Sequence, residues 1–199
     1  MTTTLFLVRH AAHDLLGRVL TGRMTGVSLG DQGRDQAESL AEHLAGEAVA
    51  AVYTSPLERA RETAAPIAAR LALNPQVLGG ITEVDYGDWS GMRFDALDQD
   101  PRWAAWNRSK ATQRPPGGES LLDVQHRAIG VLETICAAHP ESGVVVVSHG
   151  DVIKAALAHY LGLGLEGIAR FEISPASLST FAVGAWGAKV HAINEVARP

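Results

Sequence analysis

The sequence predicts an α/β fold, a three-layer α/β/α sandwich in which helices cover both faces of a mostly parallel, doubly wound sheet. Short apolar runs rich in β-branched residues alternate along the chain with longer segments of helical period, as expected for strands joined by helices. One run, residues 144–147, consists of four valines, and a strand that is apolar on both faces belongs at the centre of such a sheet. Because a typical domain has roughly 150 residues, we expect residues 1–199 to form a single domain with a lid insertion at about 84–118.

The composition argues against several classes of protein. With 17 Lys plus Arg against 22 Asp plus Glu, the net charge of −5 argues against a nucleic-acid partner. No apolar run approaches the roughly 20 residues of a membrane span, and the first run is too short for a secretion signal, so no membrane partner is expected. The single cysteine, Cys136, cannot close an intrachain disulfide, which favours a cytoplasmic location. The oligomeric state is left open, with a homodimer as one alternative.

Strands are expected at residues 4–8, 48–53 and 144–147, and the first helices follow from their capping residues. A helix over about 56–71 has the clearest start, because Ser55 and Glu58 can form a capping box. Ser28 with Asp31, and Ser120 with Asp123, repeat this pair of residues. The helices that they precede are expected to bury Ala37, Leu40, Ala41 and Leu44, and Leu121, Val124, Ala128, Val131, Leu132 and Ile135, respectively.

The last part of the chain predicts one more helix and then short strands. The helix covers about 151–161 and is closed by Gly162, and the tail from Arg170 onward has the pattern of two or three edge strands. Between residues 83 and 118 the regular patterns stop, and such a long connection inside a compact domain is more often a lid or binding loop than a linker. Its Trp103 and Trp106 either wall a substrate pocket or form the small core of the lid.

Polar and charged residues follow two of the predicted strands directly. Arg9 and His10 follow the first strand, and Ser148-His149-Gly150 follows the four valines, at the sheet edge where ligands of parallel sheets bind. Arg59 lies in the first turn of a helix that begins just past the second strand, and helix N-termini attract phosphate. Because an unpaired buried guanidinium is costly, these residues together predict a pocket for a phosphoryl group.

The sequence resembles the histidine phosphatase superfamily, also called the phosphoglycerate mutase-like family. The resemblance covers nearly the whole chain, and the set of motifs in the family's order is far more specific than any one of them. The matching segments are Leu5-Phe6-Leu7-Val8-Arg9-His10, Thr21-Gly22-Arg23, Leu29 through Gly33-Arg34 with Gln36-Ala37, Tyr53-Thr54-Ser55-Pro56-Leu57-Glu58-Arg59-Ala60-Arg61-Glu62-Thr63, Glu83-Val84-Asp85-Tyr86-Gly87-Asp88-Trp89-Ser90-Gly91, Pro116-Gly117-Gly118-Glu119-Ser120 and Val147-Ser148-His149-Gly150.

The resemblance implies that His10 is the nucleophile that accepts the phosphoryl group, and that Glu83 donates the proton. It also implies that Arg9, Arg59 and His149 bind the phosphate. A neutral imidazole, with an ordinary pKa of about 6.5, can attack phosphorus without a separate base. Residue chemistry alone leaves Asp85 and Asp88 as rivals of Glu83 for the proton donor, and spacing within the motif favours Glu83.

Substrate contacts are expected from Gly22, Arg23, Gly150 and His13. No cofactor and no metal are expected. The segment His10-Ala11-Ala12-His13-Asp14 superficially suggests metal ligands, but the neighbouring arginines would repel a cation.

The sequence departs from the family pattern directly after His10. The family usually has a glycine there, then an acidic or amide residue and a small hydroxyl residue, with an asparagine further on. This chain has Ala11-Ala12-His13-Asp14-Leu15-Leu16 instead. Alanine keeps the backbone carbonyl that could orient His10 but resists a positive φ, while the missing hydroxyl and amide remove two expected phosphate contacts.

The predicted function is that of a phosphomonoesterase which hydrolyses a small phosphorylated metabolite through phospho-His10 without a metal. Two alternatives remain at the level of sequence: phosphoryl transfer of the phosphoglycerate mutase type, and a non-catalytic member of the fold that binds a phosphorylated ligand. The segment after Glu83 resembles the phosphatase pattern and is followed by acidic residues at Asp95, Asp98 and Asp100, which favours hydrolysis over the mutase reaction.

Overall fold

The computed structural model describes residues 1–196. Within this range the strands are β1 (Thr2–Arg9), β2 (Val49–Thr54), β3 (Gln76–Val77), β4 (Gly143–Ser148), β5 (Ser177–Gly184) and β6 (Gly187–Val196). The α-helices are α1 (Asp31–Leu44), α2 (Glu58–Arg70), α3 (Phe94–Leu97), α4 (Pro101–Arg108), α5 (Leu121–Ala138) and α6 (Gly150–Tyr160). Short 3₁₀ turns are η1 (Gly79–Ile81), η2 (Gly87–Trp89) and η3 (Leu165–Arg170).

In the described residues the strands form one sheet in the order β3-β2-β4-β1-β5-β6. The first four in this order are parallel, whereas β5 is antiparallel to β1 and β6 is antiparallel to β5. The four-valine strand is central, as predicted, and every residue of β4 is buried. The expectation that the tail forms edge strands is right for β6 and wrong for β5, because β5 fills the place between β1 and β6.

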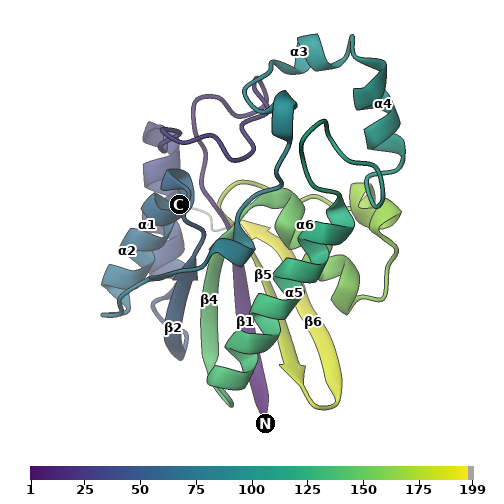
Figure 1. Ribbon diagram of the computed structural model, residues 1–199. Helices are drawn as coiled ribbons and strands as arrows, with labels where there is room; N and C mark the ends of the chain where they lie inside the picture. Colours follow the sequence, from purple (N-terminus) through teal and green to yellow (C-terminus); the bar gives the residue numbers. More distant parts are fainter. Residues whose placement is uncertain (197–199) are drawn as a thin grey trace.

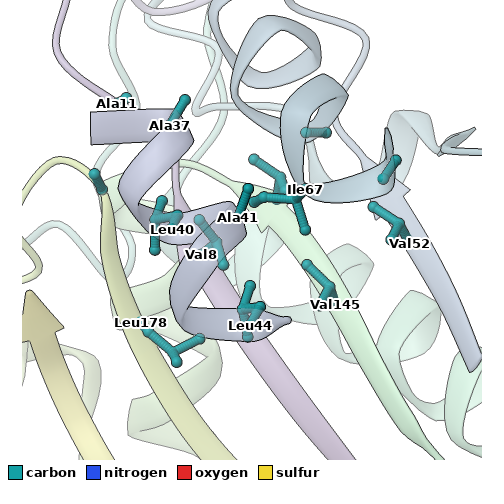
Figure 2. Close-up of a cluster of buried hydrophobic side chains, with 14 of the residues drawn as sticks. Val8, Ala11, Ala37, Leu40, Ala41, Leu44, Val52, Ile67, Val145 and Leu178 are labelled. Atoms are coloured by element: carbon teal, nitrogen blue, oxygen red, sulfur yellow. The ribbon is translucent and has the colours of Figure 1, made fainter. Parts of the chain in front are cut away.

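Helices cover both faces of the sheet, which confirms the predicted sandwich (Figure 1). On one face, Leu40 and Leu44 of α1 and Ile67 of α2 pack with Val8 and Val145 of the sheet, and Figure 2 shows these side chains gathered between the two layers. On the other face, α5 and α6 pack against the side chains of β1 and β4 that point the opposite way, such as Leu5, Leu7, Val144 and Val146. No helix within residues 1–196 has the length and apolar character needed to cross a bilayer.

The capping pairs were predicted correctly for one helix of three. The box of Ser120 and Asp123 is present at the start of α5. It is absent at α1, whose N-cap residue is Gly30, and at α2, whose N-cap residue is Leu57; neither has a side-chain cap. The Ser55 hydroxyl instead makes a 2.7 Å hydrogen bond with the His149 ring. Ser55 has the residue type of a helix cap, but because it lies at the edge of the sheet its side chain contacts a candidate site residue instead.

Residues 84–118 lie beyond the carboxyl ends of the parallel strands and contain the short helices α3 and α4, which the sequence did not predict (Figure 1). Trp89 and Trp106, each 1% exposed, pack with Leu121 and Val124 of α5 and with Val152 of α6. Of the two alternatives for Trp103 and Trp106, the structure therefore supports the small core, which fixes this segment on the helices below it.

Replacement of Leu40 by alanine tests the packing of α1 on the sheet. Leu40 is 0% exposed, so the cavity left by Leu40→Ala is expected to lower the free energy of unfolding by about 2–5 kcal/mol. Urea denaturation followed by circular dichroism measures this. Leu122→Ala is the matched control, because Leu122 is 39% exposed and the same truncation there removes little buried surface. Equal losses in the two variants would contradict the placement of α1.

Candidate active site

The topology brings the predicted site residues to one edge of the sheet. Arg9 is the last residue of β1, and His10 follows it. His149 directly follows β4, and Arg59 is the second residue of the helix after β2. Because β2, β4 and β1 are adjacent and parallel, their carboxyl ends meet at the same edge. The ring centroids of His10 and His149 are 5.1 Å apart, and the Arg59 guanidinium Nε lies 3.4 Å from His10 Nε2.

The ring of His10 is held in one orientation. Its Nδ1 lies 2.8 Å from the carbonyl oxygen of Ala11. A carbonyl can only accept, so Nδ1 carries the hydrogen and Nε2 keeps its lone pair. Burial, followed by the positive charges of Arg59 and Arg9, lowers the pKa of His10 well below its ordinary value. The imidazole is therefore neutral at physiological pH, with its free nitrogen turned toward Arg59.

The loop after His10 is fixed by α1 and α2. The backbone N–H of Ala11 donates to Thr63 Oγ1 at 2.9 Å, and that of Ala12 donates to Gln36 Oε1 at 3.0 Å. At Gly33, a Cβ would lie 1.9 Å from the Ala12 carbonyl oxygen, so only glycine lets α1 approach this closely. Ala11 does not adopt a positive φ. Alanine can therefore replace the usual glycine here and still present the carbonyl that orients His10.

Three buried nitrogen atoms at this edge have no hydrogen-bond partner among the described residues: Arg9 Nε, Arg59 Nη1 and His149 Nδ1. Other nitrogens of the same side chains are held in place, since Arg9 Nη1 donates to the Ile173 carbonyl at 2.5 Å and Arg59 Nη2 donates to the Gly22 carbonyl at 2.7 Å. A buried donor without a partner is costly, more so on a charged group. An anion with several acceptor oxygens would satisfy all three nitrogens.

Glu83 lies directly before the 84–118 segment. Its Oε1 accepts from the N–H of Val84 at 2.9 Å, and its carboxyl group lines the cavity beside His10. Desolvation, and then the negative charge of Asp151, raises the pKa of Glu83 to about 7. Asp151 is itself held by the Tyr86 hydroxyl, which donates to its Oδ2 at 2.7 Å. Neither Asp85 nor Asp88 lines this cavity, so the geometry favours Glu83 among the three candidate proton donors.

Arg23 does not line the cavity but holds the backbone of Glu83. Its Nε donates to the Glu83 carbonyl oxygen at 2.9 Å, and Arg127 Nη2 reaches the same oxygen at 3.2 Å. Both guanidiniums also bind Glu119 Oε1 at 2.7 Å. This ion-pair network fixes the start of the 84–118 segment and, with it, the position of the Glu83 carboxyl group.

The cavity over His10 has a volume of about 390 Å³. Of the expected substrate contacts, Gly22, Gly150 and His13 line it, and the His13 ring stacks on His10 with centroids 5.5 Å apart. A Cβ at position 150 would lie 3.4 Å from the unpartnered Arg9 Nε and would cover it. Arg59 and His149 lie outside the lining, buried around His10. No cluster of three His, Cys, Asp or Glu suited to a metal ion occurs within residues 1–196.

Five charged or polar residues that line the cavity were not expected as site residues from the sequence: Thr21, Tyr86, Asp151, Lys154 and Glu172. A signal existed for two of them, because Asp151 and Lys154 are three residues apart in the first turns of the helix after His149 and so share a face. The sequence around Glu172 gave no signal of a role in the site, since only the packing of the tail brings this residue to the cavity.

The site and fold are those of a known family. The sequence profile of the histidine phosphatase superfamily, branch 1, matches residues 5–196. The chain therefore belongs to the histidine phosphatase superfamily.

Several relatives share most of the chain. Phosphoserine phosphatase 1 of Hydrogenobacter thermophilus is 34% identical over 180 residues, covering 88% of this chain and 84% of that protein. Glucosyl-3-phosphoglycerate phosphatase of Mycobacterium tuberculosis is 34% identical over 170 residues, covering 80% of this chain and 75% of that protein.

Other relatives are longer, and two solved structures match the whole fold. The chain spans only 49% of a bifunctional protein of Mycobacterium tuberculosis, to which it is 34% identical over 179 residues, or 89% of this chain. The structure of a mycobacterial glucosyl-3-phosphoglycerate phosphatase superposes with a TM-score of 0.88 at 27% identity, covering 98% of this chain and 99% of that one. Bacillus stearothermophilus YhfR superposes with a TM-score of 0.91 at 27% identity and 98% coverage of both chains.

Replacement of Asp151 by asparagine tests the electrostatics of the site. Removal of a neighbouring negative charge makes the Glu83 carboxylate less costly, so the pKa of Glu83 should fall from about 7 toward its ordinary value of 4.5. A titration of the carboxyl carbon by NMR, with glutamate labelled, measures it. Glu172→Gln serves as the control, because Glu172 does not figure among the causes of the shift. An unchanged pKa in Asp151→Asn would show that burial alone sets it.

Proposed function

We propose that the chain is a phosphomonoesterase that hydrolyses a small phosphorylated metabolite through a phosphohistidine intermediate on His10. The observation that carries this proposal is the position of the neutral His10 Nε2 among three buried, unpartnered nitrogens of Arg9, Arg59 and His149. The Nε2 lone pair, which accepts only a long 3.4 Å hydrogen bond from Arg59 Nε, lies beside donors that match the oxygens of a phosphoryl group.

In the first step, His10 Nε2 forms a bond to phosphorus while the bond from phosphorus to the ester oxygen breaks. Negative charge on the phosphoryl oxygens is met by Arg9, Arg59 and His149, so positioning and electrostatics supply most of the acceleration. Glu83, which is protonated on a substantial fraction of molecules near neutral pH because its pKa is about 7, gives its proton to the leaving alcohol. The products are the alcohol and phospho-His10.

In the second step, water attacks phosphorus and the bond to Nε2 breaks. The Glu83 carboxylate left by the first step accepts a proton from the attacking water. Inorganic phosphate leaves, His10 regains its lone pair, and Glu83 is again protonated. The hydrogen bond from His10 Nδ1 to the Ala11 carbonyl stabilises the positive charge that the ring carries while phosphorylated.

Hydrolysis is favoured over the alternatives by the relatives and by the cavity. The Hydrogenobacter thermophilus relative is named a phosphoserine phosphatase, and the Mycobacterium tuberculosis relative is named a glucosyl-3-phosphoglycerate phosphatase. The presence of His10, Glu83 and the three phosphate-binding side chains argues against a non-catalytic protein. We further propose that catalysis needs no metal, since Arg9 and Arg59 beside His10 would repel a cation, and that the protein is cytoplasmic, in keeping with one cysteine.

The substrate contacts that we propose are Gly22, Gly150 and His13 on the cavity wall. Arg23, which the sequence analysis expected to touch substrate, is proposed instead to act through Glu83, whose carbonyl oxygen it holds.

Loss of His10 tests the nucleophile. The variant His10→Ala should hydrolyse 4-nitrophenyl phosphate roughly 10⁴-fold or more slowly than the unsubstituted protein, with chelator present in both assays. His43→Ala is the matched control, because His43 is exposed on α1. Radiolabelled phosphate should be trapped on the unsubstituted chain and not on His10→Ala. Strict dependence on an added metal, or no turnover of any phosphomonoester, would contradict the proposal.

Replacement of Glu83 by glutamine tests whether Glu83 is the acid that protonates the leaving alcohol. For an alkyl phosphate, whose leaving group needs a proton, Glu83→Gln should lower kcat/KM by about 10²–10⁴. For 4-nitrophenyl phosphate, whose leaving group does not, the loss should be small. The sign of the pH effect follows from the pKa: above about 7, Glu83 loses its proton, so kcat/KM for the alkyl phosphate falls as pH rises. That decline should be absent in Glu83→Gln, and equal losses for both substrates would argue against Glu83.

A further inference from the structure

The part of the cavity beyond the phosphate-binding nitrogens has an unusual balance of charge. Glu83, Asp151 and Glu172 supply three carboxyl groups to its lining, whereas Arg9 and Lys154 are the only lining residues with a permanent positive charge. Arg9 serves the phosphoryl group through the unpartnered Nε described above. Lys154 is the one cation left for the rest of a substrate.

The charge of Lys154 is already compensated. Its Nζ lies 3.3 Å from Oε2 of Glu172, and its side chain is largely buried. A substrate carboxylate or second phosphate would compete for Lys154 with Glu172, whose side chain is 78% exposed, and would also meet the negative charge of Asp151. Among the lining residues, Lys154 is therefore the only positively charged partner besides Arg9 for a second anionic group, and it is shared with Glu172.

Asp151 is well placed to recognise a positive charge. Its Oδ2 accepts from the Tyr86 hydroxyl at 2.7 Å, which anchors the carboxylate, while Oδ1 has no partner among the described residues and belongs to a side chain that lines the cavity. Asp151 lines the same cavity as Glu83, the proposed donor of the proton to the leaving alcohol. A cation carried on that alcohol can therefore reach it.

Apolar residues of the lining restrict the rest of the substrate. Leu16, Val19, Leu20 and Phe94 are also in the lining and contribute apolar surface, against which polar groups of a substrate would lack partners. The arrangement suits a short alcohol with a hydrocarbon part and one cationic group.

We propose that the cavity selects phosphomonoesters of short amino alcohols, with the phosphoryl group at His10, the protonated amine on Asp151, and no second acidic group on the substrate. This inference rests on the proposed phosphomonoesterase activity and adds the class of alcohol to it. Asp151 is the specificity-determining residue, and Tyr86 positions its carboxylate.

The test compares substrates that differ in one charge. O-Phosphoethanolamine and propyl phosphate have the same shape, with an ammonium in the first where the second has a methyl group, and 3-phosphoglycerate carries a carboxylate. We expect kcat/KM to be about tenfold or more higher for O-phosphoethanolamine than for propyl phosphate, and lowest for 3-phosphoglycerate. In Asp151→Asn the ratio of the first two should approach one. The ratio of the two kcat/KM values is the readout, because a change in the pKa of Glu83 caused by Asp151→Asn affects both substrates alike.

Asp98→Asn is the matched control, because the same substitution at an exposed carboxylate outside the cavity lining should leave that ratio close to the unsubstituted value. Thermal unfolding and turnover of 4-nitrophenyl phosphate show that each variant is folded and active. Should Asp151→Asn not fold, the order of the three substrates in the unsubstituted protein decides by itself. Equal rates for O-phosphoethanolamine and propyl phosphate, or a preference for 3-phosphoglycerate or O-phosphoserine over O-phosphoethanolamine, would overturn the inference while leaving the phosphomonoesterase proposal intact. If 4-nitrophenyl phosphate and every other ester are left unhydrolysed, the proposed function itself fails.

Discussion

Buried positive charge at the carboxyl ends of β1, β4 and β2 is the constraint on which the site depends. Arg9 and Arg59 are brought to this edge by strands and a helix that are themselves fixed in the core, so the guanidiniums cannot withdraw into water. Backbone carbonyls of Ile173 and Gly22 satisfy one nitrogen of each, and other nitrogens remain unpartnered. The core thus holds part of the hydrogen-bonding capacity of the site ready for an anion, at a cost that a bound phosphoryl group offsets.

The same low-polarity surroundings shift the pKa values of the proposed nucleophile, His10, and the proposed acid, Glu83, in opposite directions. Desolvation penalises the charged form of each, so it lowers the pKa of His10 and raises the pKa of Glu83. The charges of Arg59 and Arg9 lower the pKa of His10 further, whereas Asp151 raises the pKa of Glu83 and the two arginines partly oppose that rise. A neutral nucleophile and a protonated acid can therefore coexist near neutral pH, and the two groups need no separate devices to reach those states.

Support around the site comes from elements far apart in the sequence. The loop after His10 is held by Thr63 of α2 and Gln36 of α1, and the Glu83 carbonyl is held by Arg23 and Arg127, which share Glu119. The motifs around Gly33 and Arg59 therefore occur together because they support the loop after His10, and the motif around Glu119 because it supports Glu83. The replacement of the usual glycine by Ala11 is harmless to this arrangement, since the backbone there does not need a positive φ.

The sequence alone determined the sandwich, the central place of β4 and the convergence of Arg9, His10, Arg59 and His149. These follow from strand periodicity and from the rule that parallel strands end at one edge, which are local patterns with a fixed spatial meaning. Tertiary structure alone decided the place of β5 inside the sheet, the role of Ser55 beside His149 in place of a helix cap, and the position of Arg23 behind Glu83. It also decided which charges line the cavity, because Glu172 and Lys154 are paired only once the tail has packed beside α6. Contacts between residues distant in the chain depend on how whole elements pack, and no spacing in the sequence records that packing.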